Sequence, residues 1–305
     1  MLNPKIEEYI NQLLLLRKNL GYSIYTDKGF YKNFINYINQ NFPDNTEITK
    51  SCIDGWLLYK KNIKPSTLNG YILCLKRLSA FLKQNGIESY VPSADYFLKE
   101  QDYFPKILSK ENLNHIFQVI DKYPTYAVIF RLMYCCGLRP GEPLRLKTND
   151  IIFDRNEIYI RQSKNYKDRH IIFSDDLMKL LKSYDSTQDP NRLYFFETRR
   201  KKPFCCNRLS TFLRNIIKNE KLDFAKGFRP YDFRHNFATR NIMNWLDQGL
   251  DVMTMLPYLS TYMGHKKFTY TFYYIHLLPE RLFTSKNIDW NKLASVYEGG
   301  TYEKN

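Results

Sequence analysis

Apolar side chains recur at three- and four-residue spacing through the first 86 residues of the chain. This spacing places them on one face of a helix, and the intervening polar residues cover the other face. Pro4 and Gly21 stand where helices commonly begin and end. The pattern predicts helices over about 4–20, 27–39, 50–61 and 66–86. We therefore expect a compact four-helix unit at the start of the chain.

A stretch without helical spacing follows, over residues 87–106. It is charged and is interrupted by Pro92 and Pro105, which indicates a linker. Two domains are also what 305 residues favour, because domains commonly have about 100–200 residues. The expected organisation is a helical domain over 1–90, a linker over 91–106, a second domain over 107–285 and a C-terminal tail over 286–305.

Two short segments of the second domain alternate between apolar and polar residues, as strands do. They are residues 157–161 and 170–173, and the polar stretch between them predicts a hairpin. A helix is expected to open at Ser109, and everything after about Ser174 again reads as helical. The fold class expected is mainly α, with an all-α N-terminal domain and a mostly helical α+β domain that contains a small antiparallel sheet.

The charge of the chain is strongly positive and unevenly distributed. Lys and Arg number 46 against 31 Asp and Glu, which gives a formal net charge of +15. Residues 1–106 contain 14 basic and 10 acidic residues, whereas residues 107–305 contain 32 and 21. This excess favours a polyanionic partner, either nucleic acid or an anionic membrane. The densest basic run is either a phosphate contact or a charged loop, and it consists of Arg199, Arg200, Lys201 and Lys202.

A membrane is the less favoured of these partners. No apolar run approaches the roughly 18 residues that a membrane-spanning helix needs. Glu7 and Glu8 precede the first apolar run, which is the wrong order for a signal peptide. The six cysteines lack the C-x-x-C spacing of a zinc site. We interpret them as reduced packing residues of a cytoplasmic protein, and we expect neither a metal nor a cofactor.

Residues suited to phosphodiester chemistry lie in separated segments of the second domain. Arg139 and Arg234 offer planar forks for phosphate oxygens. Lys164, in the predicted hairpin, has a side chain that can protonate a leaving alkoxide. His265 follows a glycine, and nine residues later Tyr274 supplies a hydroxyl able to form a covalent intermediate. Together they can attack a phosphodiester without a metal.

These segments resemble motifs of the tyrosine recombinase (phage integrase) family and occur in the family's order. Arg139 lies in a segment similar to the G-L-R-x-x-E box, and Lys164 in one similar to the hairpin pattern G-K-G-x-K-x-R. Arg234 opens a segment similar to the R-H-x-F-A-T box, and His265 completes a match to the G-H box. The resemblance implies that these four residues are catalytic and that Tyr274, at the nucleophile's position, attacks the phosphate.

Four further residues in or near these motifs are considered separately. Tyr231 stands where the family usually has His, and we include it in the catalytic set because a phenol can donate a hydrogen bond to phosphate. Glu142 is expected to orient an arginine through a salt bridge, and His235 to give structural support. Tyr273 directly precedes Tyr274 and stays open as an alternative nucleophile.

The resemblance covers nearly the whole chain and implies contacts with duplex DNA from both domains. The helix from Ser66 is similar to a segment of the family's SAM-like core-binding domain. The interval from Arg234 to His265 is longer than in the commonest members, as in transposon-type recombinases. The expected DNA contacts are Thr67, Lys76, Arg77, Lys167, Arg169 and the run Arg199, Arg200, Lys201 and Lys202.

The function implied is site-specific recombination or integration of DNA. Tyr274 would form a 3′-phosphotyrosyl bond and release a 5′-hydroxyl, without metal or ATP. A homotetramer would hold two duplexes, and a monomer or dimer would exist off DNA. Three alternatives stay open: a type IB topoisomerase-like enzyme, a telomere-resolving enzyme and a catalytically inactive DNA-binding protein.

Overall fold

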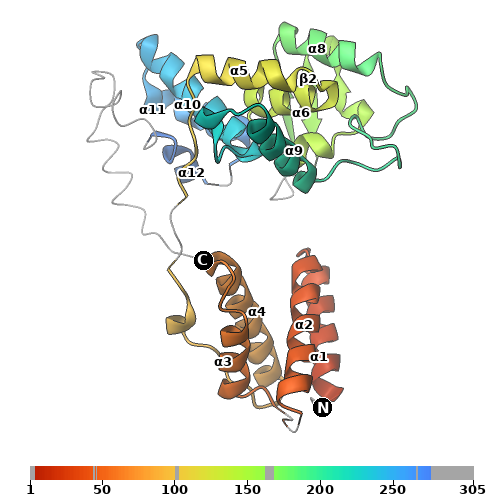
Figure 1. Cartoon of the computed structure of the whole chain (residues 1–305), viewed down its shortest axis with the longest axis vertical. Coiled ribbons are helices and arrows are strands. Elements are labelled where there is room, and N and C mark those ends of the chain that lie inside the picture. Colours follow the sequence, from red (N-terminus) through yellow and green to blue (C-terminus); the bar gives the residue numbers. More distant parts are fainter. Residues whose placement is uncertain are drawn as a thin grey trace. The chain divides into compact units, whose positions relative to one another are not determined.

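The computed structural model describes residues 4–43, 45, 47–99, 103–161, 168–265 and 267–275. The chain forms two compact units, Met1–Tyr103 and Phe104–Asn305. Both are built mainly from helices, and a small sheet lies in the second (Figure 1). The division between the units falls inside the segment 91–106 that the sequence assigned to a linker.

Four helices form the first unit, as the apolar spacing predicted. Helices α1 and α2 both contact α4, and α3 packs on α2. Aromatic rings fill the space between them, and the indole of Trp56 meets Phe30 and Phe34 edge to face. The helices are α1 (Pro4–Asn19), α2 (Tyr25–Asn41), α3 (Lys50–Tyr59) and α4 (Pro65–Gln84).

The segment after α4 packs against the first unit rather than leaving it. The Tyr90 amide donates a hydrogen bond to the Ile48 carbonyl at 2.8 Å. Leu98 exchanges two hydrogen bonds with the Asn69 side chain, at 2.8 and 2.9 Å, close to the short 3-10 turn η1 (Ala94–Tyr96). Much of the expected linker is therefore part of the first unit, because irregular backbone can still be held by side-chain contacts.

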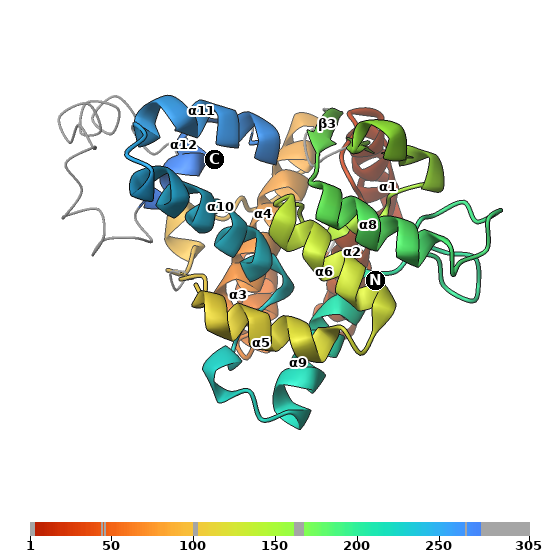
Figure 2. The ribbon, with the colours of Figure 1, turned by 90° about the horizontal axis from the view of Figure 1, so that it is seen from above.

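Helix α6 lies at the centre of the second unit. It contacts α5, α7, α8 and α10, and Figure 2 shows α5, α8 and α10 around it. No helix within the described ranges is long and apolar enough to cross a bilayer. The α-helices are α5 (Lys110–Ile120), α6 (Pro124–Cys135), α7 (Gly141–Leu144), α8 (Asp175–Asp185), α9 (Cys206–Asn219), α10 (Pro230–Asp247), α11 (Val252–Met263) and α12 (Thr269–Phe272).

A three-stranded antiparallel sheet accompanies these helices, in the order β1-β2-β3. The predicted hairpin is confirmed as β2 (Glu157–Ile160) and β3 (Arg169–Ile172), with Ile158 opposite Ile171. Sequence reasoning missed β1 (Ile151–Ile152), because two residues are too short to show alternation. Three 3-10 turns complete the unit: η2 (Thr148–Asp150), η3 (Phe153–Arg155) and η4 (Asp223–Ala225).

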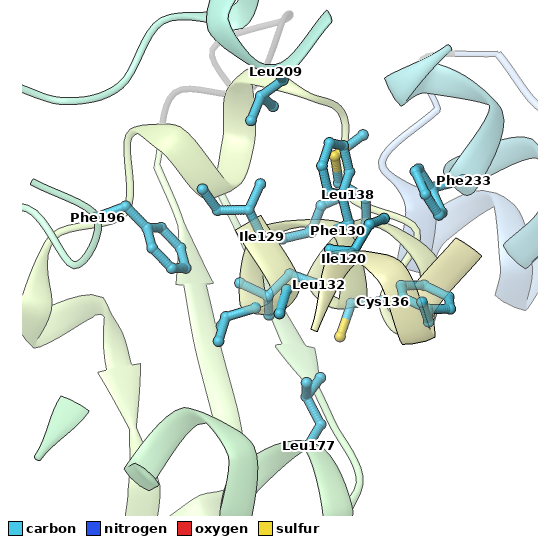
Figure 3. Close-up of a cluster of buried hydrophobic side chains, with 14 of the residues drawn as sticks. Ile120, Ile129, Phe130, Leu132, Cys136, Leu138, Leu177, Phe196, Leu209 and Phe233 are labelled. Carbon is cyan, nitrogen blue, oxygen red and sulfur yellow. The ribbon is translucent and has the colours of Figure 1, made fainter. Parts of the chain in front are cut away.

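The core of the second unit is a cluster of aliphatic and aromatic side chains from different elements. Figure 3 shows them converging from α5, α6, α8, α9 and α10. The labelled members are Ile120, Ile129, Phe130, Leu132, Cys136, Leu138, Leu177, Phe196, Leu209 and Phe233. Because Phe233 is part of this core, the N-terminal half of α10 is fixed in place by close packing.

The expectation of helices throughout the part after Ser174 is wrong for residues 186–205. These residues form turns, and they bury Phe195 and Phe196 without regular structure. The buried guanidinium of Arg192 holds the loop by donating hydrogen bonds to the Phe195 carbonyl at 3.1 Å and the Asp189 carbonyl at 3.0 Å. The apolar residues of this loop were misread as part of a helix because they, like the apolar face of a helix, are buried in the core.

Candidate active site

Arg234 lies in the second turn of α10 and is fully buried, with 0% of its surface exposed. Its guanidinium donates hydrogen bonds to the carbonyls of Gly137 and Met263, the second at 2.9 Å. Its Nε is buried without a hydrogen-bond partner in the part of the chain that the structure describes. Burial lowers the pKa of Arg234, because a charged group is costly to remove from water.

The backbone at Gly137 allows this approach. Gly137 has φ +61°, and a Cβ atom there would lie 2.5 Å from the Phe237 ring. Any other residue would clash with that ring, in a backbone conformation that L side chains rarely adopt. The glycine after α6 therefore positions one side of the arginine site.

His265 lies directly after Gly264, which ends α11 with φ +68°. Its Nε2 is 2.9 Å from Nη2 of Arg234, and its Nδ1 is 2.7 Å from Oγ1 of Thr271. Because a guanidinium can only donate, Nε2 accepts and Nδ1 carries the proton. Burial, assisted by the charges of Arg234 and Arg139, lowers the pKa of His265 to about 3. The ring is therefore neutral at pH 7.

Glu142, in α7, joins Arg139 to Arg169. Arg139 Nη1 lies 2.9 Å from Oε1 of Glu142, and Arg139 Nη2 donates to the Gly264 carbonyl at 2.7 Å. Burial alone would raise the pKa of Glu142, but hydrogen bonds and charge from Arg169 and then Arg139 lower it to about 2. The predicted salt bridge between Glu142 and an arginine is confirmed, and it involves two arginines.

Arg169, expected from the sequence to contact DNA, is largely buried and paired with Glu142. Its two terminal nitrogens bind the two carboxylate oxygens of Glu142 at 3.0 and 2.8 Å. Its Nε donates to the Tyr262 carbonyl at 3.1 Å. All three nitrogens of the guanidinium bind partners inside the protein, so Arg169 connects β3 to Glu142 and to the Tyr262 carbonyl.

Tyr274 follows α12, and only 3% of its surface is exposed. Its ring stacks on that of His265, with the centroids 6.1 Å apart. Burial raises the pKa of Tyr274 to about 12, although the charge of Arg234 and a hydrogen bond with it lower the pKa in part. Tyr273, by contrast, is 37% exposed. Of the two tyrosines, Tyr274 is thus the buried one, stacked on His265 and close to the charge of Arg234.

Tyr231 occupies the first turn of α10 and is 38% exposed. Its ring lies 5.0 Å from that of His235, one helical turn later. The phenol is close enough to influence the pKa of both Arg234 and Tyr274. Tyr231 therefore lies beside Arg234 and Tyr274, with which the sequence analysis grouped it.

The remaining residues that the sequence assigned to catalysis or to DNA contacts lie elsewhere in the chain, and not all of them are described. Lys164 and Lys167 lie outside the described residues. In the first unit, Thr67 is exposed, the Lys76 ammonium lies 5.7 Å from the Phe97 ring, and Arg77 is engaged by Asp27 at 3.2 Å.

The basic run at residues 199–202 is exposed and forms a turn. A bridge between Glu197 and Pro203 closes the turn, and Lys201 adopts φ +54° within it. No acidic residue is recorded as an ion-pair partner of the run within the described ranges. The run therefore presents a compact positive surface.

Two supporting residues escaped the sequence analysis. Thr271 accepts the hydrogen bond that orients His265. Asn236 accepts from the Leu108 amide at 2.8 Å and donates to the Lys106 carbonyl at 2.9 Å, which ties the start of the second unit to α10. A polar residue between apolar neighbours was the available signal for Thr271, whereas nothing marked Asn236, whose partners lie about 130 residues away.

The assembled groups suit an oxyanion. Arg139 and Arg234 bring two guanidinium groups together with the neutral imidazole of His265 and the phenol of Tyr274. Within the described ranges, no three His, Cys, Asp or Glu residues form a group that could hold a metal ion. Guanidinium groups bind phosphate oxygens through charge-assisted hydrogen bonds, so a phosphodiester fits this set of donors.

Comparisons with known proteins agree with this geometry. The chain is 26% identical over 289 residues to the putative integrase/recombinase y4rE of Sinorhizobium fredii, covering 90% of this chain and 91% of the relative. It is also 26% identical to the tyrosine recombinase XerA of Saccharolobus solfataricus, covering 90% of this chain and 88% of that protein.

Solved structures show the same fold. A lambda integrase dimer bound to a COC' core site matches with a TM-score of 0.64 and 17% identity, covering 88% of this chain and 94% of that one. The Tn1549 transposon integrase in complex with a circular intermediate DNA matches with a TM-score of 0.64 and 16% identity, covering 87% and 94%. The profile of the phage integrase family matches residues 106–281, more than half of the chain. The chain therefore belongs to the phage integrase family.

Proposed function

We propose that this protein is a site-specific DNA recombinase that cuts and rejoins duplex DNA through a 3′-phosphotyrosyl intermediate. The observation that carries the proposal is the buried Arg234, whose guanidinium binds two backbone carbonyls and the imidazole of His265 and lies close to the buried phenol of Tyr274. A buried cation of this kind is stabilised when an anion binds beside it. A scissile phosphate placed there would meet the nucleophile directly.

The first chemical step is the attack of the Tyr274 oxygen on phosphorus. Arg139 and Arg234 stabilise the negative charge that develops on the phosphate oxygens. Lys164, at the position expected for the general acid, gives its proton to the departing 5′-oxygen. The phosphodiester is exchanged for a phosphotyrosine, so its bond energy is kept and a 5′-hydroxyl of a second strand can reverse the step.

DNA as the partner is supported by the relatives and by the charge of the chain. The lambda and Tn1549 integrase structures contain DNA. The net charge of +15 and the exposed run at 199–202 supply positive surface for phosphates. A homotetramer on two duplexes remains part of the proposal. So does action in the cytoplasm, with which the six free cysteines are compatible.

A nicked suicide substrate tests the proposal. Loss of the short 5′-fragment should trap a protein–DNA adduct that survives denaturation and forms in EDTA. Tyr274→Phe removes one oxygen and should abolish the adduct while DNA binding persists. Tyr273→Phe is the matched control and should still form it.

The outcomes separate the alternatives. An adduct that disappears in Tyr273→Phe and persists in Tyr274→Phe would move the nucleophile by one residue. The wild type failing to form an adduct on its own flanking DNA would favour a DNA-binding protein without catalysis. Relaxation of supercoils without joining of two site-bearing duplexes would favour a topoisomerase-like enzyme.

The role of Lys164 has a separate test. Lys164→Ala should slow cleavage far more than it weakens DNA binding, because one lysine among 46 basic residues contributes little to affinity. When sulfur replaces the 5′-bridging oxygen of the substrate, the leaving thiolate departs without needing a proton. Lys164→Ala should therefore cleave this substrate at a restored rate. Failure of that rescue, with the wild type active on the same substrate, would rule out Lys164 as the acid.

A further inference from the structure

His235 carries a buried nitrogen for which the fold provides no partner. The residue is 8% exposed, and its Nδ1 has no hydrogen bond within the described part of the chain. Leaving a buried polar atom unpaired is costly, so such atoms are uncommon in native proteins. The position of this nitrogen therefore calls for a functional explanation.

Three tyrosine rings lie close to the imidazole ring of His235. Its ring centroid lies 5.0 Å from that of Tyr231, 5.6 Å from that of Tyr274 and 6.2 Å from that of Tyr273. It follows Arg234 directly on α10. The unpaired nitrogen thus belongs to the side chain that packs on the proposed nucleophile.

Attack by Tyr274 requires an acceptor for its proton, and burial makes that proton hard to lose, with a pKa of about 12. Both ring nitrogens of His265 are engaged, by Arg234 and by Thr271. A guanidinium offers no lone pair, and a phenol such as Tyr231 is a weak base at neutral pH. Among the described side chains in ring contact with Tyr274, His235 keeps an imidazole nitrogen without a partner.

We propose that Nδ1 of His235 accepts the phenolic proton of Tyr274 as Tyr274 attacks the phosphate; this inference rests on the proposed function. The Tyr274 oxygen forms its bond to phosphorus, and the bond from phosphorus to the 5′-oxygen breaks with its electron pair on that oxygen. The phenolic proton moves to His235, and Lys164 protonates the 5′-oxygen. Religation reverses both transfers.

The protonation state of His235 suits this role. Burial, followed by the charge of Arg234, lowers the pKa of His235 to about 4, so the ring is neutral at pH 7. In the tautomer that carries its proton on Nε2, the lone pair of Nδ1 can accept a proton. A phosphate bound at Arg234 would offset that positive charge and make protonation of the ring easier in the complex than in the free protein. The ring therefore becomes a better acceptor when substrate arrives.

His235→Phe separates proton transfer from packing, because it keeps a ring against Tyr231 and Tyr274 and removes both nitrogens. Single-turnover cleavage of the suicide substrate should fall roughly 100-fold or more, the usual contribution of general base catalysis. His115→Phe removes an exposed imidazole from α5 and is the matched control, with an unchanged rate expected. An unchanged rate in His235→Phe would overturn the proposal.

A second substrate removes the need for the tyrosine proton. A strand ending in a 3′-p-nitrophenyl phosphate can be joined to a 5′-hydroxyl without Tyr274, since p-nitrophenolate departs unprotonated. His235→Phe should ligate this strand at the wild-type rate. If His235→Phe slowed cleavage and ligation equally, His235 would act by holding the phosphate site in place rather than by accepting a proton, which would contradict the proposal. A wild type that ligates but forms no adduct would instead contradict the proposed function.

Discussion

Each unit of the protein places a carboxylate between two arginines, and among the described residues the second unit adds a further cation, Arg234, that is fully buried. In the first unit, Asp27 is bound by Arg17 at 2.7 Å and by Arg77 at 3.2 Å. These contacts connect three helices, α1, α2 and α4. The network is structural, since its charges are largely satisfied inside the fold.

The second unit repeats this arrangement at Glu142 and then departs from it. Arg139 and Arg169 share Glu142, whereas Arg234 is deeper and is held by carbonyls and an imidazole. A buried charge without an opposite charge is destabilising unless a ligand provides one. The difference between the units thus separates an ion network that holds helices together from one that is prepared for an anion.

The largest expected effect is on the rate of adduct formation, when Arg234, the buried cation without a carboxylate partner, is replaced. Arg234→Lys replaces the fork by a single ammonium, and the adduct-forming rate at saturating DNA should fall on the order of 10²–10³-fold. Arg17→Lys in the first unit is the counterpart and should change that rate less than about twofold. Equal losses in the two variants would remove the distinction between the networks.

A second prediction concerns acid stability. Glu142 has an ordinary pKa of 4.5 and a folded pKa of about 2, so its contribution is complete above pH 4.5 and is lost as the pH falls toward 2. The difference corresponds to about 3 kcal/mol. Urea unfolding followed from pH 5 to pH 2 should show this loss, and Glu142→Gln should flatten the profile in that window. If the pH profile of Glu142→Gln equalled that of the wild type, Arg139 and Arg169 would not stabilise the ionised form of Glu142.

The smallest effect is expected at two glycines with positive φ. Gly264 has φ +68°, and an added Cβ would lie 3.0 Å from a nitrogen of Arg169. Gly264→Ala should lower the free energy of unfolding by about 1–2 kcal/mol and also slow adduct formation, because its carbonyl binds Arg139.

The matched variant in the first unit is Gly86→Ala, at φ +77° with open space around it. It should cost about 1 kcal/mol and leave the rate unchanged. Adduct formation that slows equally in both glycine variants would show that global stability, rather than the position of Arg139, sets the rate.

The sequence was sufficient for features that repeat along the chain. Helical spacing predicted α1 to α4, and alternation predicted β2 and β3. Motifs similar to a known family indicated Arg139, Arg234 and His265, which the fold brings together. Each of these signals is local or is carried by a resemblance to other sequences.

Features that depend on distant partners could not be predicted in this way. The pairing of Arg169 with Glu142 was not predicted, because the two residues lie 27 positions apart and no sequence pattern links them. The partners of Asn236 are more than 120 residues distant. The unpaired nitrogen of His235 is likewise a property of packing, which a sequence does not display.

The hydrogen bond from Arg139 to the Gly264 carbonyl spans 125 residues of chain. At ribosomal rates of about 5–20 residues per second, roughly 6–25 s pass between the synthesis of these two residues. The arginine therefore emerges well before its acceptor, and the nucleophile emerges later still. A nascent chain has no complete catalytic centre during this interval, so we expect no DNA cleavage by a copy whose synthesis has not yet passed Tyr274.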